Sequence, residues 1–272
     1  MKELHVQLVI LDDEDFLGHS ESKRPTCSEA TRLHHPVVTS DTNILKPELA
    51  VARRPLSEKP NPPDIAGIAL DPAAPLVVVD VDEVLALFMR GFERFVGRHG
   101  LEMRIDRFAL FQCIYKPGET THLDLAAGRK LFDAFFEAEV EHIDPAPGAA
   151  EALKALSRDA SIVILTNAPP QGREPRARWL AKHDLDYPML INVGLKGPPA
   201  AALAALTSGP VAFIDDLLPN LDSVAADAPA VSRFQMVADE RLRPLAFAAP
   251  DRHPRIDEWE ALGPAIAEAI RR

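Results

Sequence analysis

The chain has 272 residues, of which 47% are hydrophobic, so it can bury a sizeable core in one domain with an added segment. Its formal net charge of −11 argues against a nucleic-acid partner, because a surface that binds a phosphate backbone has to be basic. The two cysteines, Cys27 and Cys113, have neither metal-ligand nor redox spacing, which indicates a reducing compartment.

The N-terminal sequence shows no sign of a signal peptide. Its short apolar run, residues 8–11, lacks a basic region before it and is followed by an acidic cluster instead of a small-residue cleavage site. No stretch of the chain approaches the roughly 20 apolar residues of a transmembrane helix. We therefore expect a cytoplasmic protein with no membrane partner.

Residues 1–72 differ in composition from the rest of the chain. Phe16 is their only aromatic residue, prolines recur throughout, and charges of both signs are scattered without a period. Such a segment buries too little apolar surface to offset the entropy lost on ordering it. We predict a disordered, proline-rich extension over residues 1–72 and a folded part over residues 73–272.

The first predicted element of the folded part is a strand over residues 76–79. Its unbroken apolar, β-branched run is typical of a strand buried on both faces, as in parallel sheets covered by helices. Asp80 and Asp82 follow it, at the carboxyl end where such sheets bind ligands. One acid could simply cap the next helix, but two so close together require a cation or a shared proton.

The stretch between Val84 and Asp144 is too long for a single crossover and has helical spacing. Apolar residues from Leu85 to Phe95 recur at intervals of three and four, and Asp124 can cap a second amphipathic helix. We expect a small helical cap insertion at about residues 86–143, over the strand ends. Three arginines at every fourth position should form a solvated face of its first helix: Arg90, Arg94 and Arg98.

Beyond the insertion, strands and helices alternate to the end of the chain. This alternation predicts an α/β fold, a Rossmann-like parallel sheet with right-handed crossovers and helices on both faces. Trp179 and Leu180 should face inward from one of the helices. Strands are expected at 161–166, 189–193 and 211–214, and helices at 149–156, 176–182, 199–206, from about 219 and near the C-terminus.

Polar residues stand at or near four strand ends in a fixed order. Taken singly, each has an ordinary structural interpretation: threonine is common in strands, a loop lysine is usually solvated, and paired acids can cap the following helix. In one sheet, all four points could converge on a single crevice. They are Asp80 with Asp82, then Thr166, then Lys196, then Asp215 with Asp216.

This order resembles the haloacid dehalogenase-like (HAD) hydrolase superfamily. Its phosphatases carry an Asp-x-Asp-x-Thr/Val motif, a strand-final Ser or Thr, a Lys and a pair of acids, and one type of member has a helical cap inserted after the first motif. The resemblance covers about residues 75–235, with all four motifs in order. The matching stretches are 80–84, 164–167, 194–197 and 213–216.

The resemblance implies a Mg²⁺-dependent hydrolase of a small phosphorylated metabolite, acting through an aspartyl-phosphate intermediate. Asp80 would be the nucleophile, and Asp82 the general acid and then the general base. Asp82 also argues against dehalogenation, because dehalogenases of the superfamily lack this second acid.

The remaining motif residues would bind the metal ion and the phosphoryl group. By resemblance, Mg²⁺ is held by the Asp80 carboxylate, the backbone carbonyl of Asp82 and Asp215, with Asp216 as a further ligand or an outer support. The phosphoryl oxygens would be bound by three groups: the Thr166 hydroxyl, the Asn167 backbone N–H and the Lys196 ammonium, which also neutralises the nucleophile.

Two other functions compete with the phosphatase hypothesis. A HAD-like binding or regulatory protein with little or no turnover stays open because Glu83 stands where the family often has a glycine or another small or polar residue, and because of the unusual N-terminal segment. A receiver-type phospho-acceptor domain uses similar residues, but in a different order and without such an insertion. The sequence predicts neither the identity of the substrate nor an oligomeric state.

Overall fold

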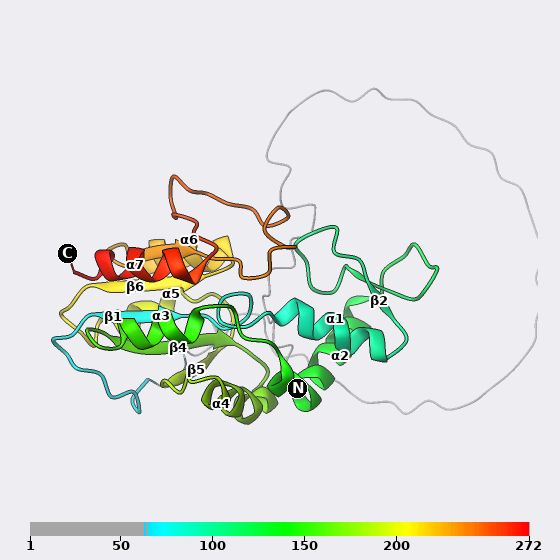
Figure 1. Cartoon of the computed structure of the whole chain (residues 1–272), viewed down its shortest axis with the longest axis horizontal. Coiled ribbons are helices and arrows are strands. Elements are labelled where there is room, and N and C mark those ends of the chain that lie inside the picture. The colour runs from blue at the N-terminus through cyan, green and yellow to red at the C-terminus, as the bar shows by residue number, and fades with distance from the viewer. Residues whose placement is uncertain (1–62, 64, 272) are drawn as a thin grey trace, which may run out of the picture. The chain divides into compact units, whose positions relative to one another are not determined.

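The computed structural model of the chain describes residues 63 and 65–271 (Figure 1). Most of the segment predicted to be disordered, residues 1–62 and 64, lies outside the described residues, as does residue 272. The last residues of that segment pack on the fold: Ile65, Ile68 and Leu70 lie against a core cluster of strand and helix residues, and the Pro72 carbonyl accepts the Ser208 N–H at 2.8 Å. The packed part of the chain therefore includes residues ahead of the predicted start at 73.

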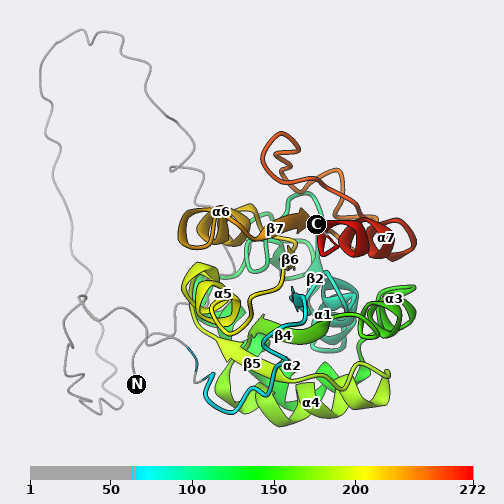
Figure 2. The ribbon, with the colours of Figure 1, turned by 90° about the vertical axis from the view of Figure 1, so that its left-hand side faces the viewer.

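Five parallel strands form the central sheet: β1 (Leu76–Val79), β4 (Ser161–Asn167), β5 (Met189–Asn192), β6 (Val211–Asp215) and β7 (Ser232–Gln235). Their order is β5-β4-β1-β6-β7, so the predicted parallel sheet is confirmed and the strand before Asp80 lies in its middle (Figure 2). The register places Val79 beside Ile164 on one side and Ile214 on the other. Residues that follow β1, β4 and β6 therefore leave the sheet at the same edge.

Helices cover both faces of the sheet, as predicted: α3 (Ala149–Leu156), α4 (Arg173–Lys182), α5 (Gly197–Ala204), α6 (Leu218–Asp227) and α7 (Trp259–Ala269). Helices α5 and α6 lie on one face, and α3 and α7 on the other (Figure 2). Because successive strand side chains point to opposite faces, Val77 and Val79 join the apolar cluster of α3, α4 and α7, whereas Leu76 and Val78 join that of α5 and α6.

The insertion between β1 and α3 contains α1 (Phe88–Arg98), β2 (Glu102–Met103), β3 (Ile114–Tyr115), α2 (Leu125–Ala138) and a 3₁₀ turn, η1 (Val140–His142). Asp124 caps α2 by accepting the Ala127 N–H at 2.8 Å. The antiparallel pair β2–β3 was not predicted, because two-residue strands have no detectable sequence period. Phenylalanine rings join α1 to α2: Phe88, Phe92 and Phe95 with Phe132, Phe135 and Phe136.

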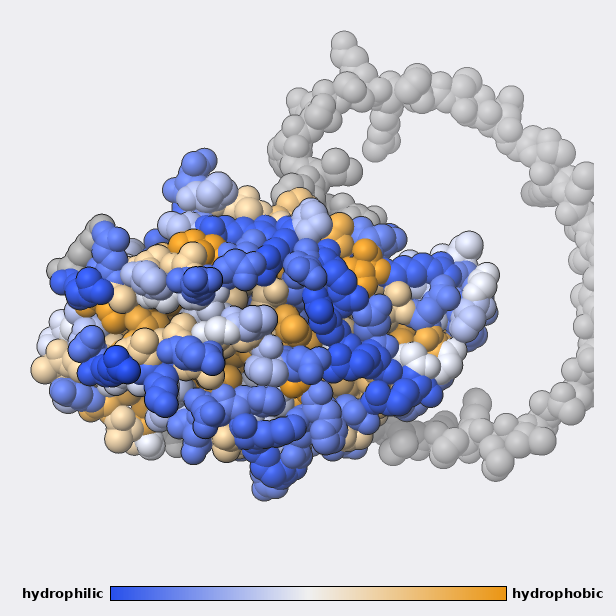
Figure 3. Space-filling view, viewed as in Figure 1, coloured by the Kyte–Doolittle hydropathy of each residue, from blue (hydrophilic) through white to orange (hydrophobic). Residues whose placement is uncertain are grey.

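Hydrophilic side chains predominate on the face of the molecule seen in Figure 3, with apolar residues in separate patches between them. Several large apolar side chains lie inside: Phe92, Phe213 and Trp259 are each at most 1% exposed, whereas Phe247 is exposed. No helix in the part of the chain that the structure describes has the length and apolar character needed to cross a membrane.

A buried tryptophan ties the last helix to the segment that follows β1. Trp259 begins α7, and its Nε1 donates a hydrogen bond to the Val84 carbonyl at 2.9 Å. Both residues are buried. The bond therefore fixes the backbone just beyond Asp82.

Replacing Trp259 by Phe should lower the free energy of unfolding by roughly 1–3 kcal/mol, because the buried Val84 carbonyl would lose its donor. Urea denaturation of the two proteins would measure the difference. Phe247→Leu is the control: Phe247 keeps 56% of its surface exposed, so its replacement should change stability by about 0.5 kcal/mol at most. Equal losses in the two variants would show that the Trp259 bond contributes nothing.

Candidate active site

The carboxyl ends of β1 and β6 bring two acids and a lysine together. Asp80 directly follows β1, Asp215 ends β6, and the two strands are neighbours. Nζ of Lys196 lies 2.7 Å from Asp80 Oδ1 and 2.7 Å from Asp215 Oδ2. Lys196 is 1% exposed and Asp215 is fully buried, so solvent does little to screen their attraction.

A third carboxylate completes this cluster. Oxygens of Asp80, Asp215 and Asp216 all lie within 4.8 Å of one another, and all three residues are buried. The single ammonium of Lys196 leaves an excess of negative charge among three carboxylates. Their oxygens are the donors that a hard divalent cation such as Mg²⁺ prefers, so the donor set fits the predicted metal.

The electrostatics of the cluster follow from burial and from like charges held close together. Burial raises the pKa of Asp80 to about 7 against the attraction of Lys196, and the charges of Asp215 and Asp82 act in the same direction as burial. Burial, followed by the charges of Asp215 and Asp80, raises the pKa of Asp216 well above its ordinary value. Burial disfavours the Lys196 ammonium, but Asp215 and Asp80 outweigh it and raise the lysine pKa.

Neighbouring groups hold the acid pair at the end of β6 in place. Asp215 Oδ1 accepts hydrogen bonds from the Leu217 N–H at 2.9 Å and from Asn220 Nδ2 at 3.0 Å. Gln235 Nε2 donates to the backbone carbonyl of Asp216 at 3.0 Å. Asp215 thus has one oxygen bound to the start of α6 and the other to Lys196.

The end of β4 places Thr166 and Asn167 at the same edge of the sheet. Thr166 is fully buried, and its Oγ1 has no hydrogen-bond partner among the described residues. The Asn167 side chain donates to the Gly194 carbonyl at 3.1 Å and accepts from Asn192 Nδ2 at 2.9 Å. Asn167 therefore supports the loop that leads to Lys196, and the Thr166 hydroxyl is a buried group with no partner in the part of the chain that the structure describes.

Asp82 lies apart from the three-carboxylate cluster and has its own cation. Arg176 of α4 donates from Nη2 to Asp82 Oδ1 at 2.6 Å, and Arg176 is fully buried. Burial raises the pKa of Asp82, and the charge of Arg176 opposes this rise. Sequence reasoning missed Arg176, although its spacing of three and four residues from Trp179 and Leu180 places it on the buried face of α4.

Glu83 is not part of the three-carboxylate cluster, although its charge contributes to the raised pKa of Asp216. Its backbone has a positive φ of 58°, a left-handed conformation that favours glycine. Its Oε1 accepts the Met89 N–H at 2.8 Å, near the start of α1, and its Oε2 accepts the Asp239 N–H at 3.1 Å. Burial raises the pKa of Glu83 to about 8, against the hydrogen bond from Met89. Glu83 thus joins the insertion to the segment after β7.

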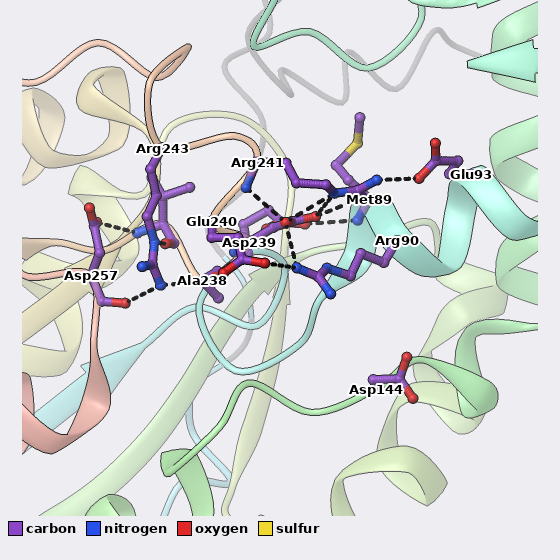
Figure 4. A network of polar contacts seen from close by, with 12 residues as sticks. Met89, Arg90, Glu93, Asp144, Ala238, Asp239, Glu240, Arg241, Arg243 and Asp257 are labelled. Carbon is purple, nitrogen blue, oxygen red and sulfur yellow. Dashed lines mark hydrogen bonds and ion pairs between the residues drawn. The ribbon is translucent and has the colours of Figure 1, made fainter. Parts of the chain in front are cut away.

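A network of ion pairs strengthens this junction (Figure 4). The Asp239 side chain is fully buried and binds Arg90 of α1 at 3.1 Å and Arg241 at 2.8 Å. Arg241 also binds Glu93 of α1 at 2.6 Å. The expected solvated row is seen for Arg94 and Arg98, whose side chains are exposed, and in part for Arg90. Each member also has an acidic partner: Arg90 with Asp239, Arg94 with Asp144 at 2.9 Å, and Arg98 with Glu139 at 2.8 Å.

Metal binding should strengthen as pH rises, because protons compete with a cation for the Asp80 carboxylate, whose pKa is about 7, and for the Asp216 carboxylate, whose pKa is also raised. Calorimetry should show a small increase in Tm on adding Mg²⁺ at about pH 5.5 and a larger one at about pH 8. Without metal, the folded state keeps protons that the unfolded state releases above the ordinary pKa of 3.8, so Tm should fall as pH rises toward 7.

Two variants serve as controls for this prediction. Asp216→Asn should remove most of the Mg²⁺-induced increase in Tm, whereas Asp251→Asn, at an exposed position, should leave it unchanged. A Mg²⁺ effect of equal size at both pH values, or one that persists in Asp216→Asn, would show that the ion does not bind at this cluster.

No protein-family model and no curated protein matches the chain. Solved structures align with it at low similarity. A protein from Burkholderia xenovorans LB400, described as a haloacid dehalogenase-like hydrolase, is 16% identical over 72% of this chain and 98% of its own, with a TM-score of 0.48. A HAD hydrolase from Entamoeba histolytica is 14% identical over 72% and 99%, with a TM-score of 0.47. A haloacid dehalogenase-like family hydrolase from Xanthomonas campestris is 15% identical over 74% and 98%, with a TM-score of 0.45. Because these sequence identities and TM-scores are low, the chemistry of this chain is inferred from its own residues.

Proposed function

We propose that this chain is a HAD-like phosphatase that hydrolyses the phosphomonoester of a small metabolite with the help of a divalent cation, Mg²⁺. The observation that supports this most directly is the position of Lys196, within 2.7 Å of both Asp80 and Asp215 at the ends of neighbouring strands. The three clustered carboxylates outnumber this one ammonium, and their excess negative charge favours a divalent cation. The unpartnered Thr166 hydroxyl, at the end of the adjoining strand, supplies a donor for a phosphoryl oxygen.

In this proposal Asp80 and Asp82 divide the chemistry between them. A carboxylate oxygen of Asp80 bonds to phosphorus as the bond from phosphorus to the leaving oxygen breaks. The leaving oxygen takes the proton of the Asp82 carboxyl group and departs as an alcohol. Water then attacks the aspartyl-phosphate and gives its proton to the Asp82 carboxylate, which restores Asp80 and releases inorganic phosphate.

The other residues at this edge of the sheet would bind the phosphoryl group that is transferred. Three donors would bind the phosphoryl oxygens: the Thr166 hydroxyl, the Asn167 backbone N–H and the Lys196 ammonium. Donors that the fold already holds in position stabilise the charge of the transition state most effectively. A bound Mg²⁺ would be held by the clustered carboxylates and would supply positive charge against the phosphoryl group. The backbone carbonyl of Asp82 remains the predicted further ligand.

The alternative of a HAD-like binding or regulatory protein has less support than the sequence suggested. It depended partly on Glu83 as an extra acid beside the metal. Both oxygens of this side chain accept hydrogen bonds, from the Met89 and Asp239 N–H groups, and its charge is a minor contribution to the raised pKa of Asp216. Its other basis, the N-terminal segment, lies mostly outside the described residues. A cytoplasmic location and the lack of nucleic-acid and membrane partners remain predictions from the sequence.

Phosphate release from a panel of small phosphate monoesters, with and without Mg²⁺, tests the proposal. Asp80→Asn should abolish turnover, and Asp82→Asn should lower it by roughly 10²- to 10⁴-fold, because the leaving group would depart without a proton. Asp159→Asn, at an exposed position beyond α3, is the matched control and should be fully active. Unchanged turnover in either site variant would contradict the mechanism, and no turnover of any substrate by the unmodified chain would favour the binding protein.

A further inference from the structure

We propose that Arg176 is a positioning residue for Asp82, an inference that rests on the proposed phosphatase function. Its guanidinium holds Oδ1 of Asp82, so that the other carboxylate oxygen faces the reacting group and exchanges the proton with the leaving oxygen. No motif of the sequence includes Arg176, and it touches neither Asp80 nor the carboxylates of β6 among the contacts that the described residues make.

The contact between Arg176 and Asp82 is short, and the arginine is more deeply buried than the aspartate. Arg176 Nη2 lies 2.6 Å from Asp82 Oδ1, and the arginine side chain is fully buried. The Asp82 side chain keeps 12% of its surface exposed, and Oδ1 is its only oxygen with a hydrogen-bond partner among the described residues. One oxygen is therefore anchored by Arg176, and the other has no hydrogen-bond partner among the described residues.

Aromatic rings prevent the guanidinium from moving away. The Phe136 ring of α2 lies 5.2 Å from Cζ of Arg176, and the Trp179 ring lies 5.9 Å from it. Gly172 makes room for Phe136, since a Cβ at residue 172 would lie 2.5 Å from the ring. Trp179 Nε1 in turn donates to the Ile143 carbonyl at 2.8 Å, where the insertion ends. Arg176 is thus held between the sheet domain and the insertion.

A purely structural role does not account for this arrangement. Nε and Nη1 of Arg176 are buried without a hydrogen-bond partner among the described residues. Burying a cation whose donors are only partly satisfied is unfavourable, and an apolar residue of similar size often stabilises such a position better. The arginine is explained by what it does to Asp82.

The test compares two leaving groups. Departure of an alkoxide from an alkyl phosphate needs the proton of Asp82, whereas 2,4-dinitrophenolate leaves without one. kcat/KM reports the steps up to the first irreversible one, here the transfer of the phosphoryl group to Asp80. A misplaced Asp82 should therefore lower kcat/KM for an alkyl phosphate and change it little for 2,4-dinitrophenyl phosphate.

The variants are Arg176→Lys, which keeps the charge, and Arg176→Met, which removes it, both in the full chain with Mg²⁺. We expect kcat/KM for the alkyl phosphate to fall roughly 10- to 100-fold more than that for the dinitrophenyl ester, with a smaller effect in the Lys variant. The ratio of the two values does not depend on the fraction of folded protein, so partial unfolding of Arg176→Met cannot produce this result. Arg178→Lys and Arg178→Met are matched controls on the exposed face of α4, where Arg178 binds Glu141, and should leave the ratio unchanged.

Asp82→Asn provides the reference for the expected pattern, since it removes the proton itself. Equal losses for both substrates in the Arg176 variants would overturn the inference and leave Arg176 with a structural role, while the proposed function would stand. Failure of the unmodified chain to release phosphate from either ester would overturn the proposed function and this inference together. The two failures are distinguished by the activity of the unmodified chain.

Discussion

The contact of Lys196 with Asp80 and Asp215 is the interaction on which the rest of the site depends. The parallel sheet brings the ends of β1 and β6 together, and the chain places an acid at each end. Without a cation between them, these buried carboxylates would repel each other in a medium that screens charge poorly. Lys196 balances part of that charge, and the remainder favours a divalent cation. Burial, together with these like charges, raises the pKa values of Asp80 and Asp216.

The insertion is joined to this site by contacts on either side of Asp82. On one side, Glu83 links the start of α1 to Asp239, and the buried Asp239 carboxylate binds Arg90. On the other side, Phe136 of α2 packs over the guanidinium that binds Asp82. The surroundings of the acid therefore come partly from the sheet domain and partly from the insertion, so a shift of the insertion would alter both of its neighbours.

Residues with local signals could be predicted from the sequence, and residues with distant partners could not. Asp80, Thr166 and Asp215 each stand at the end of an apolar strand, which a short window of sequence reveals. Arg176 gave no such signal, because its partner Asp82 lies 94 positions away and an arginine is seldom expected on a buried helix face. The orientation of Glu83 depends likewise on Asp239, 156 positions further along the chain.

The backbone of Glu83 has a consequence for movement of the insertion. A left-handed conformation costs a residue other than glycine roughly 1–2 kcal/mol, and here it is maintained while two N–H groups bind the side chain. The backbone of residue 83 is also held directly, because its N–H donates to the Ala86 carbonyl at 2.9 Å and its carbonyl accepts the Ala238 N–H at 2.7 Å. Residue 83 could relax only if these backbone bonds broke as well as the two side-chain bonds, so the strain that is released would offset only part of what displacing α1 costs.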